Sequence, residues 1–81
     1  MNNTNVFVAN IDYGVTVEEL RKLFEKHANI RSCRIMINRE TGRSRGYGFV
    51  ECETHEEAET CIKELNGHIF NDRKIAVKWG K

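Results

Sequence analysis

The sequence lacks long apolar runs, prolines, internal repeats and low-complexity tracts. Because no apolar run is long enough to cross a bilayer, nothing in it predicts a transmembrane segment. Residues 1–5 are polar and lack the basic and apolar regions of a signal peptide. We therefore expect no membrane partner and no export, and we place the protein inside the cell, in the nucleus or the cytoplasm.

Cysteine is scarce, and its positions form no recognisable framework. Cys33, Cys52 and Cys61 are odd in number and widely spaced, whereas a small secreted domain needs paired cysteines. No two cysteines are separated by two residues, and the histidines lack the spacing of a zinc finger. We expect reduced, mostly buried thiols in a reducing compartment, with no bound metal and no cofactor.

A large net charge is also missing, since 13 basic and 12 acidic residues leave a formal charge of +1. The charge is nevertheless polarised along the chain. Residues 31–45 hold five arginines and one acid, residues 73–81 hold four bases and no acid, and residues 54–66 hold four glutamates and one lysine. Total charge therefore does not predict a nucleic-acid partner. Whether the basic segments indicate one depends on the faces of the fold on which they lie.

The 81 residues, 40% of them apolar, suffice for one globular domain, which we take as residues 1–81. Alternating apolar residues predict strands over four segments: 5–10, 32–38, 46–52 and 74–79. Apolar residues at helical spacing follow Thr16 and Thr54, which predicts two helices. Each threonine has a glutamate three residues later, Glu19 and Glu57, and this pattern predicts a capping box. Residues 12–14 are interpreted as a turn, the first helix as ending near His27, and Asn66-Gly67 as the stop of the second.

This βαββαβ order predicts an α+β fold, the ferredoxin-like sandwich. Right-handed crossovers arrange its strands in a four-stranded antiparallel sheet with both helices packed on one face. The other face of the sheet is left without a cover, so its side chains are available to a partner.

The third strand indicates which side chains lie on the open face. Successive residues point to opposite sides of a strand, and Glu51 is costly to bury without a partner. Tyr47 and Phe49 share its side and therefore belong to the open face. Gly48, Val50 and Cys52, which alternate with them, face the helices.

The same alternation sorts the other strands. Val6 and Val8 match the inner aliphatic sets, so Phe7 is predicted outside. Ile37 and Trp79 lie in register with inner residues, and we place the Trp79 ring toward the helices, at the edge of the core. The predicted open face also carries basic and flexible side chains, namely Arg34, Met36, Arg45 and Lys78.

Three clustered, exposed aromatic rings are a liability unless a ligand uses them. Rings interleaved with cations suit single-stranded nucleic acid, in which every base offers a face for stacking and every nucleotide a phosphate. One or more of these rings could instead belong to the core or to a protein interface, and any one of them alone would favour the core. Together they predict a site for single-stranded RNA, and for single-stranded DNA in vitro, made of Phe7, Arg34, Met36, Arg43, Arg45, Tyr47, Phe49, Lys78 and Lys81.

Two segments resemble the motifs of the RNA recognition motif family. Residues 6–11 (VFVANI) fit its hexamer motif, and residues 45–52 (RGYGFVEC) fit its octamer motif on the third strand. The likeness extends to residues 39–45, 64–67 and 73–77 and so covers nearly the whole chain. The sequence is similar in style to glycine-rich RNA-binding proteins with a single such domain and to related ribonucleoproteins.

The resemblance implies a role for each matching residue. Phe7 and Phe49 would stack under successive bases, and Tyr47 would pack between their sugars. Arg45 would meet a phosphate, and Lys78 would contact RNA edges or backbone.

A few further positions concern the shape of the loops. The resemblance implies that Asn10 ends the first strand and orders the loop after it. Cys52 stands where an aromatic residue is usual in the family, but it points inward and concerns packing. Ala28 and Asp72 replace common glycines. None of these departures removes a stacking residue.

Two other functions compete with RNA binding. A protein-interaction module would use the same exposed face. An enzyme is less favoured, because residues 11–15 hold neither an arginine nor the glycine-rich cradle that phosphatases of this layout place after the first strand. No nucleophile and base can be paired either. We therefore expect a monomeric binding domain and no catalysis.

Overall fold

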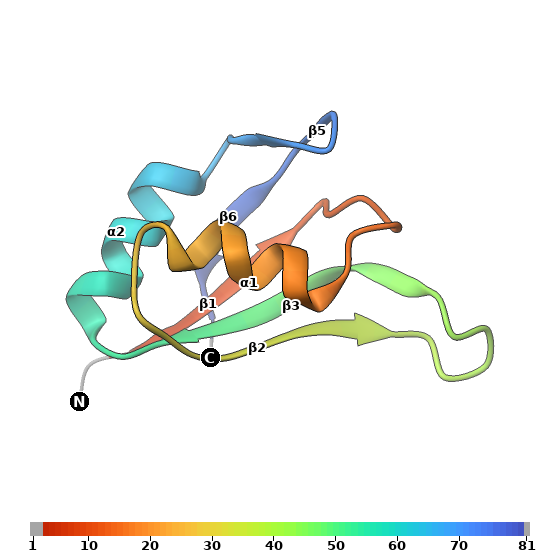
Figure 1. Cartoon of the computed structure of the whole chain (residues 1–81), viewed down its shortest axis with the longest axis horizontal. Coiled ribbons are helices and arrows are strands. Elements are labelled where there is room, and N and C mark those ends of the chain that lie inside the picture. Colours follow the sequence, from red (N-terminus) through yellow and green to blue (C-terminus); the bar gives the residue numbers. More distant parts are fainter. Residues whose placement is uncertain (1–2, 81) are drawn as a thin grey trace.

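Two helices pack on one face of a four-stranded antiparallel sheet in the computed structural model, which describes residues 3–80 (Figure 1). The sheet has the strand order β2-β3-β1-β6, with β4 and β5 forming a separate small hairpin. This confirms the predicted α+β, ferredoxin-like fold. The elements are β1 (Asn5–Ala9), α1 (Val17–Glu25), β2 (Ile30–Ile37), β3 (Ser44–Cys52), α2 (His55–Leu65), β4 (Ile69–Phe70), β5 (Arg73–Lys74) and β6 (Ala76–Trp79).

The helix starts follow their capping residues, with one difference from the sequence-based expectation. At α1 the Glu19 N–H donates to the Thr16 hydroxyl at 3.2 Å, and the Glu19 carboxylate accepts from the Thr16 N–H at 2.9 Å. At α2 the Glu57 N–H donates to the Thr54 hydroxyl at 3.1 Å, while the Glu57 carboxylate accepts from the Thr54 hydroxyl at 3.3 Å and from the backbone and side-chain amides of Asn29, in place of the Thr54 backbone N–H. The second capping box is therefore only half formed, because its glutamate ties α2 to the chain just before β2.

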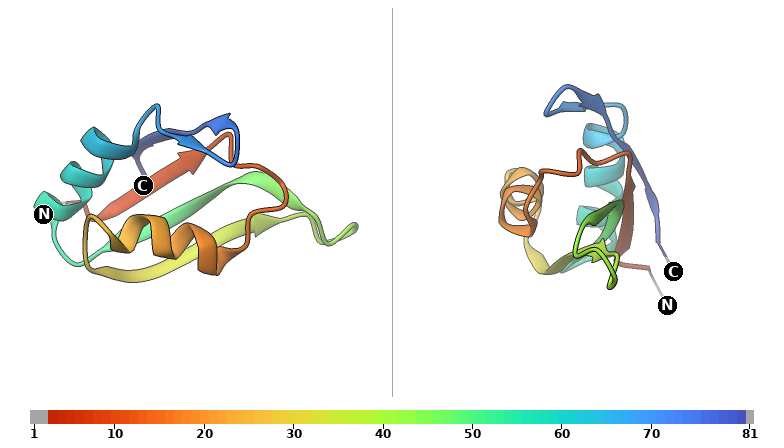
Figure 2. Two further views of the ribbon diagram at one scale, coloured as in Figure 1. Left: turned by 45° about the horizontal axis from the view of Figure 1, so that its top comes forward. Right: turned by 90° about the vertical axis from the view of Figure 1, so that its right-hand side faces the viewer.

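The core lies between the sheet and the helices, which Figure 2 shows on the same side of the sheet. Burial alternates along β1 and β3, so that Val6, Val8 and Val50 are fully buried while Phe7 and Phe49 are not. This confirms the predicted facing of both strands. The helices contribute Leu20, Leu23, Phe24, Ala58, Cys61 and Leu65 to the core.

Two apolar side chains predicted to face the core are exposed over somewhat less than half of their surface. Ile37 is 48% exposed and Trp79 is 41% exposed. Trp79 does lie on the helix side, where its ring stacks on His55 at 4.6 Å between centroids and an interplanar angle of 9°. Ile37 lies at the end of β2, after a shift in register between Ile35 and Ile37. Trp79 lies at the end of β6, where the His55 ring at the start of α2 covers one face of the indole.

The last predicted strand, over residues 74–79, is interrupted at Ile75. The Ile75 N–H donates to the His68 carbonyl at 3.0 Å, and the Ile75 carbonyl accepts from Gly67 at 2.9 Å. These bonds belong to the β4–β5 hairpin, which the alternation did not predict and whose turn holds Asn71 and Asp72 at positive φ. The first helix also ends earlier than predicted, at Glu25.

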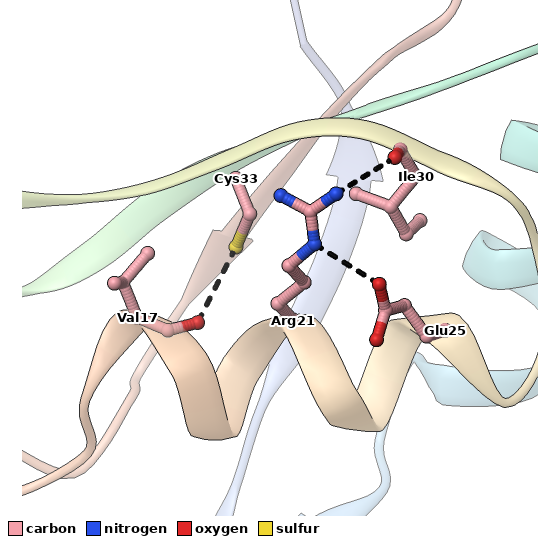
Figure 3. A network of polar contacts seen from close by, with 5 residues as sticks. All are labelled: Val17, Arg21, Glu25, Ile30 and Cys33. Carbon is pink, nitrogen blue, oxygen red and sulfur yellow. Dashed lines mark hydrogen bonds and ion pairs between the residues drawn. The ribbon is translucent and has the colours of Figure 1, made fainter.

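A polar network fastens the edge strand β2 to α1 (Figure 3). The Arg21 guanidinium bonds to the Glu25 carboxylate at 3.0 Å and donates to the Ile30 carbonyl at 3.1 Å. The Cys33 thiol donates to the Val17 carbonyl with 3.8 Å between sulfur and oxygen. These bonds add to the pairing between β2 and β3 in placing the edge strand.

Candidate nucleic-acid interface

Phe7, Tyr47 and Phe49 form one group of rings, called the aromatic platform, on the open face of the sheet. β1 and β3 are neighbours, and their register puts Phe7 opposite Phe49. The Phe7 ring centroid lies 5.5 Å from that of Phe49 and 5.8 Å from that of Tyr47. Each ring is only partly exposed, and the Phe7 ring lies against both of the others. The structure therefore brings together Phe7 and Phe49, which are predicted to stack on bases, and Tyr47, which is predicted to pack between the sugars.

Basic side chains flank this platform on both sides. Arg34 lies opposite Phe49 on β2, and Lys78 lies opposite Phe7 on β6. The row Arg34, Phe49, Phe7, Lys78 thus crosses all four strands of the sheet. The Arg34 guanidinium carbon is 5.6 Å from the Phe49 centroid, and both cations are exposed to solvent. A nucleic-acid strand laid across the sheet would meet a cation on each side of the rings.

The remaining predicted site residues lie at different distances from the platform. Met36 is half-buried on the same strand as Arg34. Arg45 lies near the start of β3 and lines a cavity with Tyr47. Arg43 belongs to the β2–β3 loop and not to the sheet face. Lys81 lies outside the described residues.

Two residues beside the platform, Tyr13 and Arg73, were not predicted from the sequence. Tyr13 in the β1–α1 loop is 64% exposed, and the Arg73 guanidinium carbon is 5.8 Å from its ring centroid. Both line a cavity of about 250 Å³ that reaches Phe7 and Tyr47. Residues 12–14 indicate only a turn, and no local pattern could show that residues 13 and 73 meet.

Asn10 links the end of β1 to the segment that carries Arg73. Its φ is +61°, a left-handed conformation that asparagine tolerates better than most residues. Its amide donates to the Lys74 carbonyl at 2.8 Å, and its carbonyl accepts from Arg73 at 2.6 Å. Asn10 therefore joins the end of β1 to the distant β5 segment, a wider role than ordering the loop that follows it.

The cysteines offer little nucleophilic or metal-binding chemistry. Burial raises the pKa of the Cys33 thiol to about 11, against a smaller opposing effect of Arg21, so the thiol is protonated at neutral pH. The hydrogen bond between the Cys52 and Cys61 thiols lowers the pKa of Cys52 and raises that of Cys61, and both side chains are fully buried. Within residues 3–80, no group of three or more His, Cys, Asp or Glu side chains could hold a metal ion.

None of the helices in the described part of the chain has the length and apolar character needed to cross a membrane.

Comparison with known proteins points to one family. A family model described as RNA recognition motif matches residues 6–76. The cleavage stimulation factor subunit 2 tau variants of Homo sapiens and Mus musculus are each 40% identical over 73 residues, which cover 90% of this chain and 12% of theirs. This chain therefore spans only a small part of the length of these curated relatives.

Solved structures agree with the family match. The RNA-binding protein PG1 superimposes with a TM-score of 0.92 at 41% identity, covering 96% of this chain and 94% of its own. The RRM of Rna15 with bound RNA (GU) superimposes with a TM-score of 0.88 at 25% identity, covering 98% of this chain and 84% of its own.

Proposed function

Because this chain belongs to the RNA recognition motif family, an RNA-binding family, we propose that it binds short single-stranded RNA on the open face of its sheet. The observation that carries the proposal is the row of side chains across the four strands, with rings in its middle and a cation at each end. The RNA bound to the similar Rna15 domain supports the same class of ligand.

Each side chain then has a role suited to its place. Phe7 and Phe49 stack on successive bases, and Tyr47 packs between their sugars. Lys78 and Arg45 neutralise phosphates, as does Arg34. We also propose that Tyr13 and Arg73 extend this surface, since both line the cavity next to the platform.

A protein-interaction module remains the alternative occupant of the same face. The cations at both ends of the row favour RNA, because a purely apolar partner would leave them unpaired. We further propose that residues 1–81 act as one monomeric, non-catalytic domain in a reducing compartment of the nucleus or cytoplasm. Binding of single-stranded DNA in vitro is part of the same proposal, because stacking does not require the 2′-hydroxyl.

The test of this function is a titration with fluorescently labelled oligouridylate, whose bases pair and stack with one another only weakly. We expect saturable one-to-one binding, with duplex RNA of the same length competing at least about tenfold more weakly. The reason is that paired bases cannot be splayed onto the rings. Equal competition by duplex RNA, or no binding of the single strand, would count against the proposal.

The salt dependence of that binding should report the cations. Lys78, Arg45 and Arg34 supply about three phosphate contacts, so log affinity should fall with log salt at a slope of about −2 for a single strand. Replacing Lys78 by glutamine should make the slope shallower by about 0.7. A slope near zero in the unmodified protein would show that phosphates are not bound by these side chains.

A further inference from the structure

Residues 39–45 (RETGRSR) form a basic segment that contains two hydroxyl groups, those of Thr41 and Ser44. Three arginines and one glutamate give this segment a formal charge of +2. Protein kinases discriminate among substrates by patterns of charge, so a kinase with an acidic substrate groove selects hydroxyls in such surroundings. The sequence alone does not decide which of the two hydroxyls such an enzyme can reach.

Thr41 is the hydroxyl of this segment that lies outside the sheet. It is exposed in the β2–β3 loop, which projects past the helices at the far end of the sheet (Figure 1). Ser44 is half-buried in β3, where it pairs with Ile37 and its hydroxyl accepts from the Gly46 N–H at 3.0 Å. A kinase must bring the hydroxyl up to the γ-phosphate and to its own catalytic aspartate, so Ser44 would first have to leave the sheet. Thr41 can enter an active site while the sheet stays intact.

The other serine and threonine hydroxyls of residues 3–80 do not combine exposure outside a strand with basic surroundings. Ser32 has arginines nearby but lies within β2, where it pairs with Glu51 of β3. The remaining threonines each have the hydroxyl bonded to a glutamate, and these are Thr4, Thr16, Thr54 and Thr60. An acidic substrate groove repels glutamates beside the hydroxyl. Thr41 is thus the hydroxyl of the described chain that best fits such an enzyme.

The surroundings of the Thr41 hydroxyl also suit the phosphate that a kinase would leave there. The hydroxyl oxygen accepts from the Arg43 N–H at 3.3 Å. The side chains of Arg39 and Arg43 are exposed on either side of it in the chain, and neither is held in an ion pair within residues 3–80. A phosphate on Thr41 carries nearly two negative charges, so it forms charge-assisted bonds with these groups and brings the charge of residues 39–45 close to zero.

We propose that Thr41 is a phosphorylation site for a protein kinase with an acidic substrate groove, and that the phosphate weakens the binding of RNA. In the transfer, the Thr41 Oγ1 attacks the γ-phosphorus of MgATP and forms the new O–P bond. The bond from that phosphorus to the β–γ bridging oxygen breaks, and ADP leaves. The hydroxyl proton passes to the catalytic aspartate of the kinase. Only the effect on RNA rests on the proposed function.

The phosphate would act on RNA through its charge. Thr41, Arg45 and Tyr47 line one cavity of about 910 Å³, so the phosphate would share an open space with a ring of the platform. There it repels the phosphates of a bound strand and competes with them for Arg45. Repulsion between exposed charges is screened by salt, so the loss of affinity is largest when salt is low.

Phosphorylation in vitro tests the site. The whole protein is incubated with MgATP and the catalytic fragment of protein kinase C, a kinase that selects basic residues around the hydroxyl. We expect a single phosphate, located on Thr41 by fragmentation mass spectrometry, and no labelling of Thr41→Val. The double variant Arg39→Gln and Arg43→Gln should be labelled at least about tenfold more slowly, because the flanking cations are gone. Labelling of Ser32 or Ser44 in place of Thr41, or no labelling of the folded protein, would overturn the assignment.

Titration of the phosphorylated protein with oligouridylate tests the effect on RNA. We expect its affinity to be about fivefold or more weaker than that of the unmodified protein at about 0.05 M salt, and less than about twofold weaker at about 0.5 M salt. Treatment with a phosphatase should restore the original affinity. Thr41→Val should bind RNA like the unmodified protein, because the charge and not the loss of the hydroxyl is responsible.

Two acidic variants show whether the position of the charge matters. Thr41→Glu and Thr60→Glu add the same charge, but Thr60 is exposed on α2, on the helix side of the sheet (Figure 2). Thr41→Glu should weaken binding by about twofold or more at low salt, since a carboxylate carries little more than half the charge of a phosphate. Thr60→Glu should bind as the unmodified protein does. Equal weakening by both variants would mean that only net charge counts, and the role assigned to Thr41 would be wrong.

The two proposals fail in different ways. If the unmodified protein binds no oligouridylate, the proposed function is wrong, and the labelling experiment still decides whether Thr41 is phosphorylated. If the unmodified protein binds RNA and the phosphorylated protein binds it equally well at low salt, the proposed function stands and the regulation by Thr41 is wrong.

Discussion

Replacing Phe7 or Phe49 by alanine is expected to weaken the binding of single-stranded RNA by about 1–3 kcal/mol each while the domain stays folded. Both rings lie on the open face, outside the set of buried residues that makes the core. Their removal therefore takes away a stacking surface without opening a cavity between the sheet and the helices. Anisotropy titrations with oligouridylate measure the affinity, and urea unfolding measures the free energy of unfolding.

The neighbouring core residue provides the control. Val8 is fully buried on the same strand as Phe7, so Val8→Ala should lower the free energy of unfolding and affect RNA binding only through the folded fraction. The double variant of Phe7 and Phe49 should lose less than the sum of the single losses, because the rings are in contact. Unfolding of either single variant would contradict the facing of the strands. Unchanged binding by both would contradict the function.

The second large effect is expected from Gly48→Ala, which should lower the free energy of unfolding by about 3 kcal/mol. A Cβ at position 48 would lie 2.2 Å from the Arg34 carbonyl oxygen and 3.0 Å from the Ile35 Cα. Both atoms belong to the backbone of β2, so no side chain can turn away to make room. The added methyl group must push β2 away from β3 and so disturb the hydrogen-bonded pairing of these two strands.

Gly42→Ala is the matched comparison in the neighbouring loop. Gly42 has a φ of +72°, but a Cβ there meets no atom within 4 Å. Only the left-handed backbone is penalised, at about 1–2 kcal/mol. Gly48→Ala should therefore be the less stable variant in urea. It should also bind RNA more weakly when folded, because displacement of β2 moves Arg34 away from Phe49. If Gly48→Ala were as stable as the unmodified protein, β2 would adjust without cost and the expected clash would be wrong.

The candidate site divides into residues that could be predicted and residues that could not. Phe7, Tyr47 and Phe49 were placed on the open face from alternation and the cost of burying Glu51, and the structure confirms their facing. Tyr13 was interpreted only as part of a turn. Its neighbour Arg73 is far away in the sequence, and no periodic pattern records which loops meet.

By itself, the sequence determined the order of the main helices and strands, the capped start of α1 and the facing of β1 and β3. These properties depend on residues a few positions apart, so local chemistry is sufficient. Only the tertiary structure decided how far the helices cover the sheet, which left Trp79 and Ile37 exposed, and only it brought Arg73 to Tyr13. It likewise brought Asn29 to the Glu57 carboxylate, which accepts from the Asn29 amides instead of from the Thr54 backbone N–H. Cover and long-range contact depend on where distant segments lie in space, and a residue's immediate neighbours in the chain do not specify this.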